Sequence, residues 1–73
     1  MTPKLKYTRR GESLAPDEVA ELRAIVVEIG LDAVAHEVGI AATTAARCAA
    51  GLSVYPPTAQ SVRTYLARRR AAK

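Results

Sequence analysis

The chain contains no tryptophan or phenylalanine and only one cysteine, and these absences limit what can hold it together. Apart from three tyrosines, the core of this 73-residue chain has to be built from valine, isoleucine, leucine and alanine. A domain of this size buries only about 60% of the surface of its unfolded chain, so small side chains favour closely packed helices. Cys48 has no partner for a disulfide, which fits a reducing compartment.

Long apolar runs are also missing. No stretch approaches the roughly 20 apolar residues of a transmembrane helix. The basic stretch MTPKLKYTRR has no apolar segment behind it, unlike a secretory signal. We therefore expect a soluble, cytoplasmic protein that does not bind membranes.

The residue types that carry enzymatic or metal chemistry are scarce. His36 is the only histidine and Cys48 the only cysteine, and a helical period places the first outward and the second inward. A zinc site usually needs four nitrogen or sulfur ligands, which the chain cannot supply. The four glycines are isolated rather than grouped in a phosphate-binding loop. We expect no enzyme activity, metal, cofactor or small-molecule ligand.

The net charge of +4 is unevenly distributed. Residues 1–14 carry four cations and one anion, residues 15–46 carry one cation and six anions, and residues 47–73 carry six cations and no anion. A chain with basic ends and an acidic middle can present one positive side to a polyanion. Basic tails that only aid solubility are the alternative.

Four segments show the periodicity and end signals of helices, which predicts an all-α fold. The expected ranges are residues 16–29, 31–38, 42–50 and 59–70, with Thr58 as the N-cap of the last. Inward positions of these helices are Val19, Leu22, Val26, Ile29, Leu31, Val34, Ala35, Val38, Ala45, Cys48, Ala49, Val62, Tyr65 and Leu66. Residues 1–12 have clustered charge and no hydrophobic period, so we predict a flexible basic arm followed by one domain, residues 13–73.

The stretch HEVGIAATTAARCAAG stops one helix and starts another almost at once. Gly39 can adopt a left-handed conformation without steric cost and turn the chain sharply. Ala35 is small enough for the next helix to cross closely, and Ile40 fills the corner. This is the geometry of a helix-turn-helix, whose second helix enters a DNA major groove.

The residues of this corner also match a known family. Over residues 16–70 the chain resembles the phage-repressor and Cro-like (Xre-type) helix-turn-helix family, and the match is carried by Val34, Ala35, Val38, Gly39, Ile40, Ala45 and Cys48. The resemblance implies a small lambda-repressor-like domain of four helices. Three features depart from the family: Ala41 cannot cap the second helix of the corner, Ala45 and Cys48 are small, and a fifth helix is missing.

The outward face of the predicted helix 42–50 consists of Thr43, Ala46, Arg47 and Ala50. Base contacts are expected from the residues near its groove-facing side: Ala42, Thr43, Ala46 and Arg47. Arg47 is the only one able to form a bidentate bond with guanine. Thr44, at the flank, is expected to bind a phosphate. With so few donors, specificity also depends on thymine methyl groups and DNA shape. A merely solvated helix face is the alternative.

Further backbone contacts follow from the resemblance, which places Ser53 and Tyr55 where family members often contact the DNA backbone. Tyr55 packing on a neighbouring proline is the alternative. The cations of the arm are expected to wrap the duplex or to enter its minor groove, as in some relatives. A tail that only aids solubility is the alternative. These cations are Lys4, Lys6, Arg9 and Arg10.

These observations predict a sequence-specific regulator that binds double-stranded operator DNA as a homodimer, a small bacterial or phage autorepressor associated with the nucleoid. Tyr65 and Leu66 are expected to form the dimer contact, or alternatively to close the chain's own core. A helical protein-interaction module, such as an antitoxin or adaptor, is the main alternative function. Nonspecific nucleic-acid compaction is a third possibility, but it predicts more lysine and no defined corner.

Overall fold

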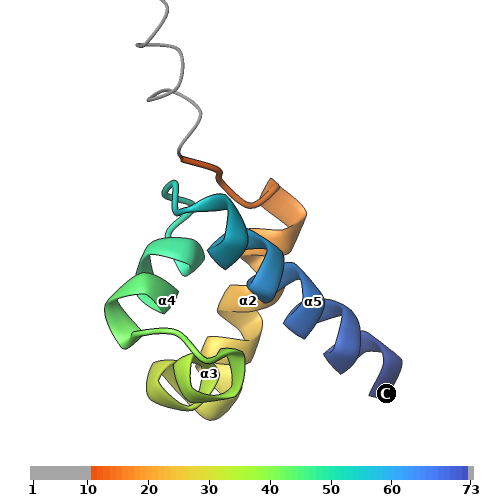
Figure 1. The fold of residues 1–73 in the computed structure, drawn as a ribbon. Helices are drawn as coiled ribbons and strands as arrows, with labels where there is room; N and C mark the ends of the chain where they lie inside the picture. Colours follow the sequence, from red (N-terminus) through yellow and green to blue (C-terminus); the bar gives the residue numbers. More distant parts are fainter. Residues whose placement is uncertain (1–10, 73) are drawn as a thin grey trace, which may run out of the picture.

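The computed structural model describes residues 11–72, which form four helices (Figure 1). These are α2 (Pro16–Ile29), α3 (Leu31–Val38), α4 (Ala42–Ala49) and α5 (Pro56–Ala72). No strand occurs in this range, so the all-helical prediction is confirmed for the described residues. Residues 1–10, which make up most of the predicted arm, lie outside them.

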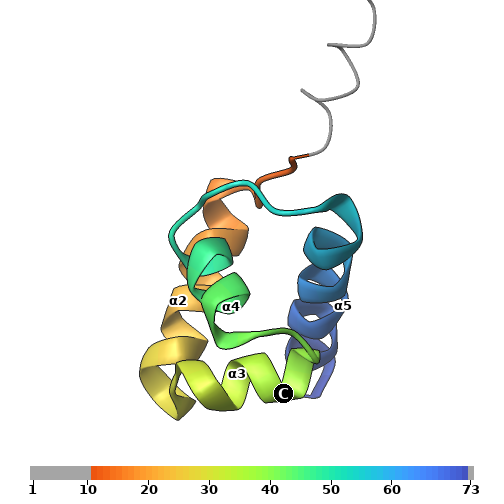
Figure 2. The ribbon, with the colours of Figure 1, turned by 60° about the vertical axis from the view of Figure 1, so that its left-hand side comes forward.

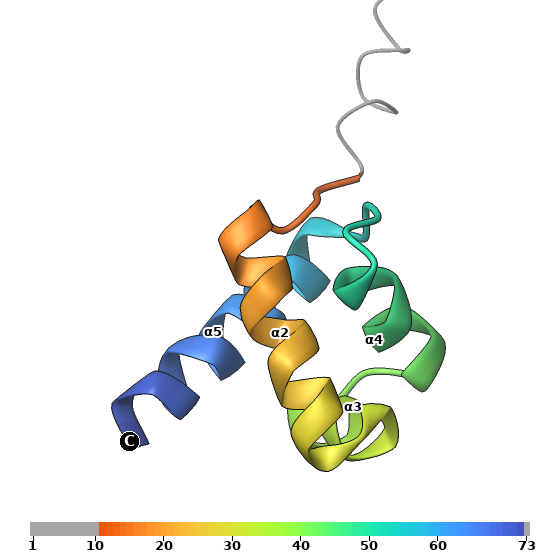
Figure 3. The same cartoon turned by 180° about the vertical axis from the view of Figure 1, so that it is seen from behind.

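The four helices surround one core. α3 runs across the bottom of the view in Figure 2, and it contacts α2, α4 and α5. From behind, α2 lies between α5 on one side and α4 on the other, in contact with both (Figure 3). α4 therefore rests on α2 and α3, and its opposite side is left for solvent.

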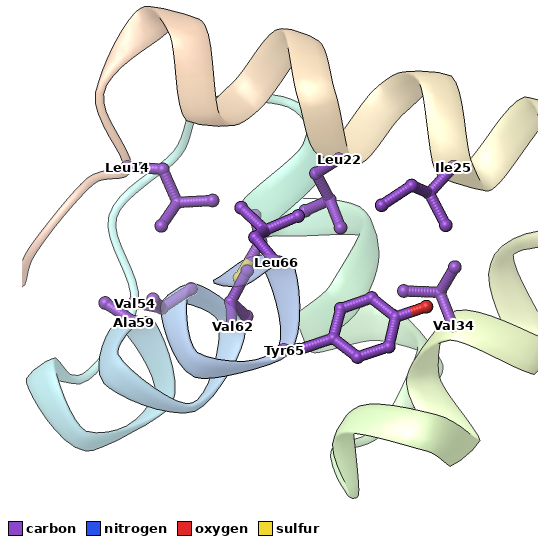
Figure 4. Close-up of a cluster of buried hydrophobic side chains, with 10 residues drawn as sticks. Leu14, Leu22, Ile25, Val34, Val54, Ala59, Val62, Tyr65 and Leu66 are labelled. Carbon is purple, nitrogen blue, oxygen red and sulfur yellow. The ribbon is translucent and has the colours of Figure 1, made fainter. Parts of the chain in front are cut away.

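The core contains side chains from all four helices and from the segments before α2 and α5 (Figure 4). The largest fully buried side chains are Leu22, Leu66, Val34, Val62 and Cys48. On α2 the buried positions are Leu22 and Ile25, whereas Val19, Val26 and Ile29 are half-buried at the edge of the core. The first helix thus faces the core through a slightly different side from the predicted one.

The start of α2 is fixed by residues on both sides of Pro16. The Glu18 carboxylate accepts a hydrogen bond from the backbone N–H of Ala15 at 2.8 Å, which satisfies a donor that the helix leaves open. Leu14 is buried just before the helix. Its spacing to Val19 is that of a hydrophobic staple, which fixes the angle at which the chain enters the helix.

The last helix begins earlier than predicted, at Pro56 rather than Ala59. Thr58 is not its N-cap, because the backbone N–H groups of Thr58 and Ala59 already donate to the Tyr55 carbonyl, at 2.9 and 3.1 Å. Proline suits the first turn of a helix, where its missing N–H would have no partner and its fixed φ is already helical. The two prolines start the helix instead of delaying it.

Tyr65 and Leu66 do not form the exposed patch predicted for a dimer contact. Their exposed fractions are 6% and 0%, and both side chains lie in the chain's own core. The Tyr65 hydroxyl donates to Glu37 at 2.7 Å, so its one polar group is satisfied within the chain. Closure of the core, the alternative interpretation, is the correct one. With so few large side chains available, the fold needs both residues inside.

The boundary of the predicted arm also changes. Glu12 pairs with Val54 in an isolated antiparallel bridge, with N–H to carbonyl distances of 2.7 Å in one direction and 3.0 Å in the other. Val54 itself is buried. Glu12 therefore belongs to the folded body. Among the described residues, no helix is long and apolar enough to cross a membrane.

Candidate nucleic-acid interface

The corner between α3 and α4 is formed by residues 39–41. Gly39 lies in the left-handed region, with φ 89° and ψ 34°. The N–H groups of Gly39 and Ile40 both donate to the Ala35 carbonyl, at 2.8 and 3.0 Å, and so close the end of α3. Ala41 follows in an extended conformation and provides no side-chain cap. The chain thus turns from α3 into α4 within three residues.

α4 has one buried side and one exposed side. Ala45 and Cys48 are buried, and burial raises the pKa of the Cys48 thiol. Of the predicted base-contacting residues, Thr43, Ala46 and Arg47 are exposed and Ala42 is half-buried. Ala50, after the last turn of α4, is also exposed, and Thr44 is half-buried at the flank of the helix. The exposed side of α4 therefore carries small side chains and a single cation.

Arg47 is tied to the loop that follows α4. Its Nη2 donates to the Ser53 carbonyl at 3.1 Å, and the Arg47 carbonyl accepts the N–H of Leu52 at 3.0 Å. The guanidinium remains exposed. Sequence reasoning missed this contact, which holds the loop against the last turn of α4. It also places the Arg47 guanidinium beside the backbone of Ser53.

The loop exposes the two residues expected to contact the DNA backbone. Ser53 is exposed, and Tyr55 has an exposed fraction of 66%. Between them Val54 is buried and paired with Glu12, so the loop is fixed at its middle. The Arg47 side chain contacts this same loop, at the Ser53 carbonyl.

Three of the four arginines of α5 pair with acids of α2, of α3 and of the segment before α2. Arg63 binds Glu12 and Glu18, and Arg70 binds Glu21 at 2.8 Å. Arg69 lies 3.5 Å from Glu28 and 3.7 Å from Glu37. These pairs join α5 to α2 and α3.

These pairs contribute to the pKa shifts of Glu18, Arg63 and Arg70, and the bond from Arg70 to Glu21 raises the pKa of Arg70. The Ala15 N–H and then Arg63 lower the pKa of Glu18, against the effect of burial. Glu12 and then Glu18 raise the pKa of Arg63.

This pairing changes where free positive charge is found. Residues 11–72 contain six arginines and seven acids, a net charge of −1. The excess of the whole chain comes from the four cations of residues 1–10 and from Lys73. The predicted contacts Lys4, Lys6, Arg9 and Arg10 lie outside the described residues. Within the described range, no ion pair involves Arg23, Arg47 or Arg68.

The residue types of metal and nucleophile chemistry can be located in the part of the chain that the structure describes. That part contains no group of three or more His, Cys, Asp or Glu side chains able to hold a metal ion. His36 is exposed on α3, whereas Cys48 is buried on α4.

Comparison with models of protein families, with curated proteins and with solved structures finds no match in any of the three. The function has to be inferred from the residues themselves.

Proposed function

We propose that the protein binds double-stranded DNA by placing the exposed side of α4 in the major groove. The observation that supports this most directly is the exposed face of α4 behind the tight Gly39 corner: Thr43, Ala46, Arg47 and Ala50 are all exposed, while Ala45 and Cys48 anchor the helix. A helix with such small outward side chains can lie deep in a groove about 12 Å wide.

Three of these four exposed residues have a defined role in this proposal. The methyl groups of Thr43 and Ala46 rest on thymine methyls, the Thr43 hydroxyl binds a base edge, and half-buried Ala42 contributes at the start of the helix. Arg47 reaches a guanine with the donors that its Ser53 contact leaves open.

Phosphate contacts come from the flanks of α4 and from the basic arm. Thr44 lies at one edge of the helix, and Ser53 and Tyr55 lie on the adjoining loop. Because the body has a net charge of −1, the nonspecific attraction to DNA depends on the basic arm, which carries Lys4, Lys6, Arg9 and Arg10.

The proposed biological role is that of a small transcriptional repressor that controls its own operon. Control by its own concentration is the simplest form of regulation for such a repressor. Binding as a homodimer doubles the few base contacts and predicts half-sites about 10–10.5 base pairs apart. The dimer contact is not formed by Tyr65 and Leu66, which are buried.

Selection of bound duplexes from random DNA, followed by fluorescence anisotropy against a scrambled duplex, tests the proposal. Arg47→Gln is expected to lose about 1–3 kcal/mol of discrimination between the two duplexes. Arg68→Gln is the matched control, because it removes the same charge from an exposed position on α5. If both variants discriminate as well as the wild type, α4 is not the reading helix.

One observation favours the alternative of a protein-interaction module. Val27, on the outward side of α2, has an exposed fraction of 86%. A single exposed valine is common on protein surfaces, however, and no other large apolar side chain of α2 is exposed. A chain that enriches no duplex in the selection would favour this alternative.

A further inference from the structure

The segment before α2 is held by contacts with two distant parts of the chain. The backbone of Glu12 pairs in both directions with Val54, in the loop after α4. The Glu12 carboxylate binds Nη1 of Arg63 on α5, and Nη2 of Arg63 donates to the Ser13 carbonyl at 3.4 Å. We call Glu12, Val54 and Arg63 the latch.

The latch also fixes the position of Gly11, the first described residue. A Cβ atom at Gly11 would lie 2.8 Å from the Cβ of Ser53, which is closer than real Cβ contacts, and 3.0 Å from its Oγ. The backbone of Gly11 therefore lies directly against Ser53. Since Arg47 bonds to the carbonyl of the same serine, the chain enters the body beside the end of α4.

Four of the chain's five cations outside residues 11–72 directly precede this point, at positions 4, 6, 9 and 10. The body itself has a net charge of −1, so these cations supply most of the attraction to phosphates. Where they begin determines which phosphates they can reach. A tethered group acts at an effective concentration set by its attachment point and its reach.

We infer that the latch is a positioning device: it holds the start of the basic arm beside the proposed DNA-reading helix, so that the arm cations meet phosphates flanking the same site. This inference rests on the proposed DNA binding. Glu12 and Arg63 act through the arm and do not touch the DNA. Losing one phosphate contact costs about fivefold in affinity at 0.15 M salt, given a slope of about 0.9 per phosphate.

Glu12→Gln in the full chain tests the inference, with Glu21→Gln as the matched control. Both changes convert a carboxylate to an amide, both remove an ion pair to an arginine of α5, and both make the chain more positive by one charge. Charge alone predicts slightly tighter DNA binding for both variants. The latch predicts about fivefold weaker binding and a shallower salt slope for Glu12→Gln only.

A second background shows whether the effect passes through the arm. In a full-length variant with glutamine at positions 4, 6, 9 and 10, Glu12→Gln is expected to leave DNA affinity unchanged. Gly11→Ala, which alters no charge but forces the chain away from Ser53, is expected to behave like Glu12→Gln in both backgrounds. Thermal unfolding of each variant shows whether it is folded at the temperature of the binding assay.

The outcomes separate the two proposals. A loss of affinity for Glu12→Gln and Gly11→Ala that disappears in the neutral-arm background supports the latch. An equal loss in both backgrounds means a general structural effect and overturns it, as does unchanged or tighter binding by both variants. If the wild type binds DNA and the latch variants bind it with unchanged affinity, the DNA-binding proposal holds and the latch inference is wrong. If the wild type binds no duplex, both proposals are wrong.

Discussion

The corner before α4 can be tested through the backbone conformation of Gly39. A Cβ built at Gly39 meets no atom within 4 Å, and the same holds at Gly30, so neither position is restricted by contacts. Both residues have positive φ, 89° at Gly39 and 96° at Gly30. Their ψ angles differ: 34° at Gly39 is left-handed helical, whereas 152° at Gly30 lies in a region open essentially only to glycine.

The cost of Gly39→Ala follows from this conformation. A left-handed backbone costs an L-residue about 1–2 kcal/mol, and the stiffer unfolded chain of alanine offsets about 0.4–1 kcal/mol of that. The net loss of about 1 kcal/mol corresponds to a fall in Tm of about 4–8 °C for a domain of this size. Gly39→Asn is expected to lose less, because asparagine tolerates the left-handed region better than alanine does.

Gly30 supplies the matched control for this comparison. At Gly30 asparagine has no left-handed well to occupy, so Gly30→Asn and Gly30→Ala are expected to lower Tm by similar amounts. Thermal unfolding followed by far-ultraviolet circular dichroism measures all four variants. If asparagine and alanine have equal Tm values at position 39, or if asparagine is equally favourable at both positions, the left-handed turn is not what shapes the corner.

Three further predictions concern stability and electrostatics. Glu18 has a pKa below its ordinary value of 4.5, so its stabilising effect is present above that pH and is lost as the pH falls below it. Glu18→Gln should therefore flatten the acid side of the stability-pH curve, and an unchanged curve would contradict this. Leu66→Ala is expected to cost about 2–5 kcal/mol in urea unfolding, and Tyr65→Phe about 1 kcal/mol through its lost bond to Glu37. If Leu66→Ala leaves the free energy of unfolding unchanged and weakens self-association, Leu66 instead belongs to a dimer contact. Glutamine at positions 4, 6, 9 and 10 should reduce the slope of log affinity against log salt by up to about 3.6, and an unchanged slope would make the arm a solubilising tail.

Local signals in the sequence predicted the helices well. The bounds of α2 and α3 agree with the predicted ranges, because Pro16, Gly30 and Gly39 mark helix ends through their own backbone preferences. The period of α4 correctly separated its buried side from its exposed side. The start of α5 differs from the predicted one, because Thr58 has the residue type of an N-cap and the sequence does not show that the two prolines before it form the first turn.

Contacts between distant residues could not be predicted in the same way. Nothing in the sequence near Arg63 indicates that Glu12, 51 positions away, is its partner. The buried positions of Leu14 and Val54 likewise depend on how the ends of α2 and α5 meet. Tyr65 was ambiguous because a helical period shows that a side chain faces inward but not whether the same chain covers it.

The central claim, that α4 reads duplex DNA, is tested most directly by nuclear magnetic resonance titration of the labelled protein with a duplex obtained by selection. The claim predicts that amide signals of Thr43, Ala46, Arg47 and Ala50 shift most, together with those of the loop at Ser53 and Tyr55, while a scrambled duplex leaves the α4 signals largely unchanged. Shifts concentrated on the outward side of α2 around Val27, or identical shifts with both duplexes, would contradict it.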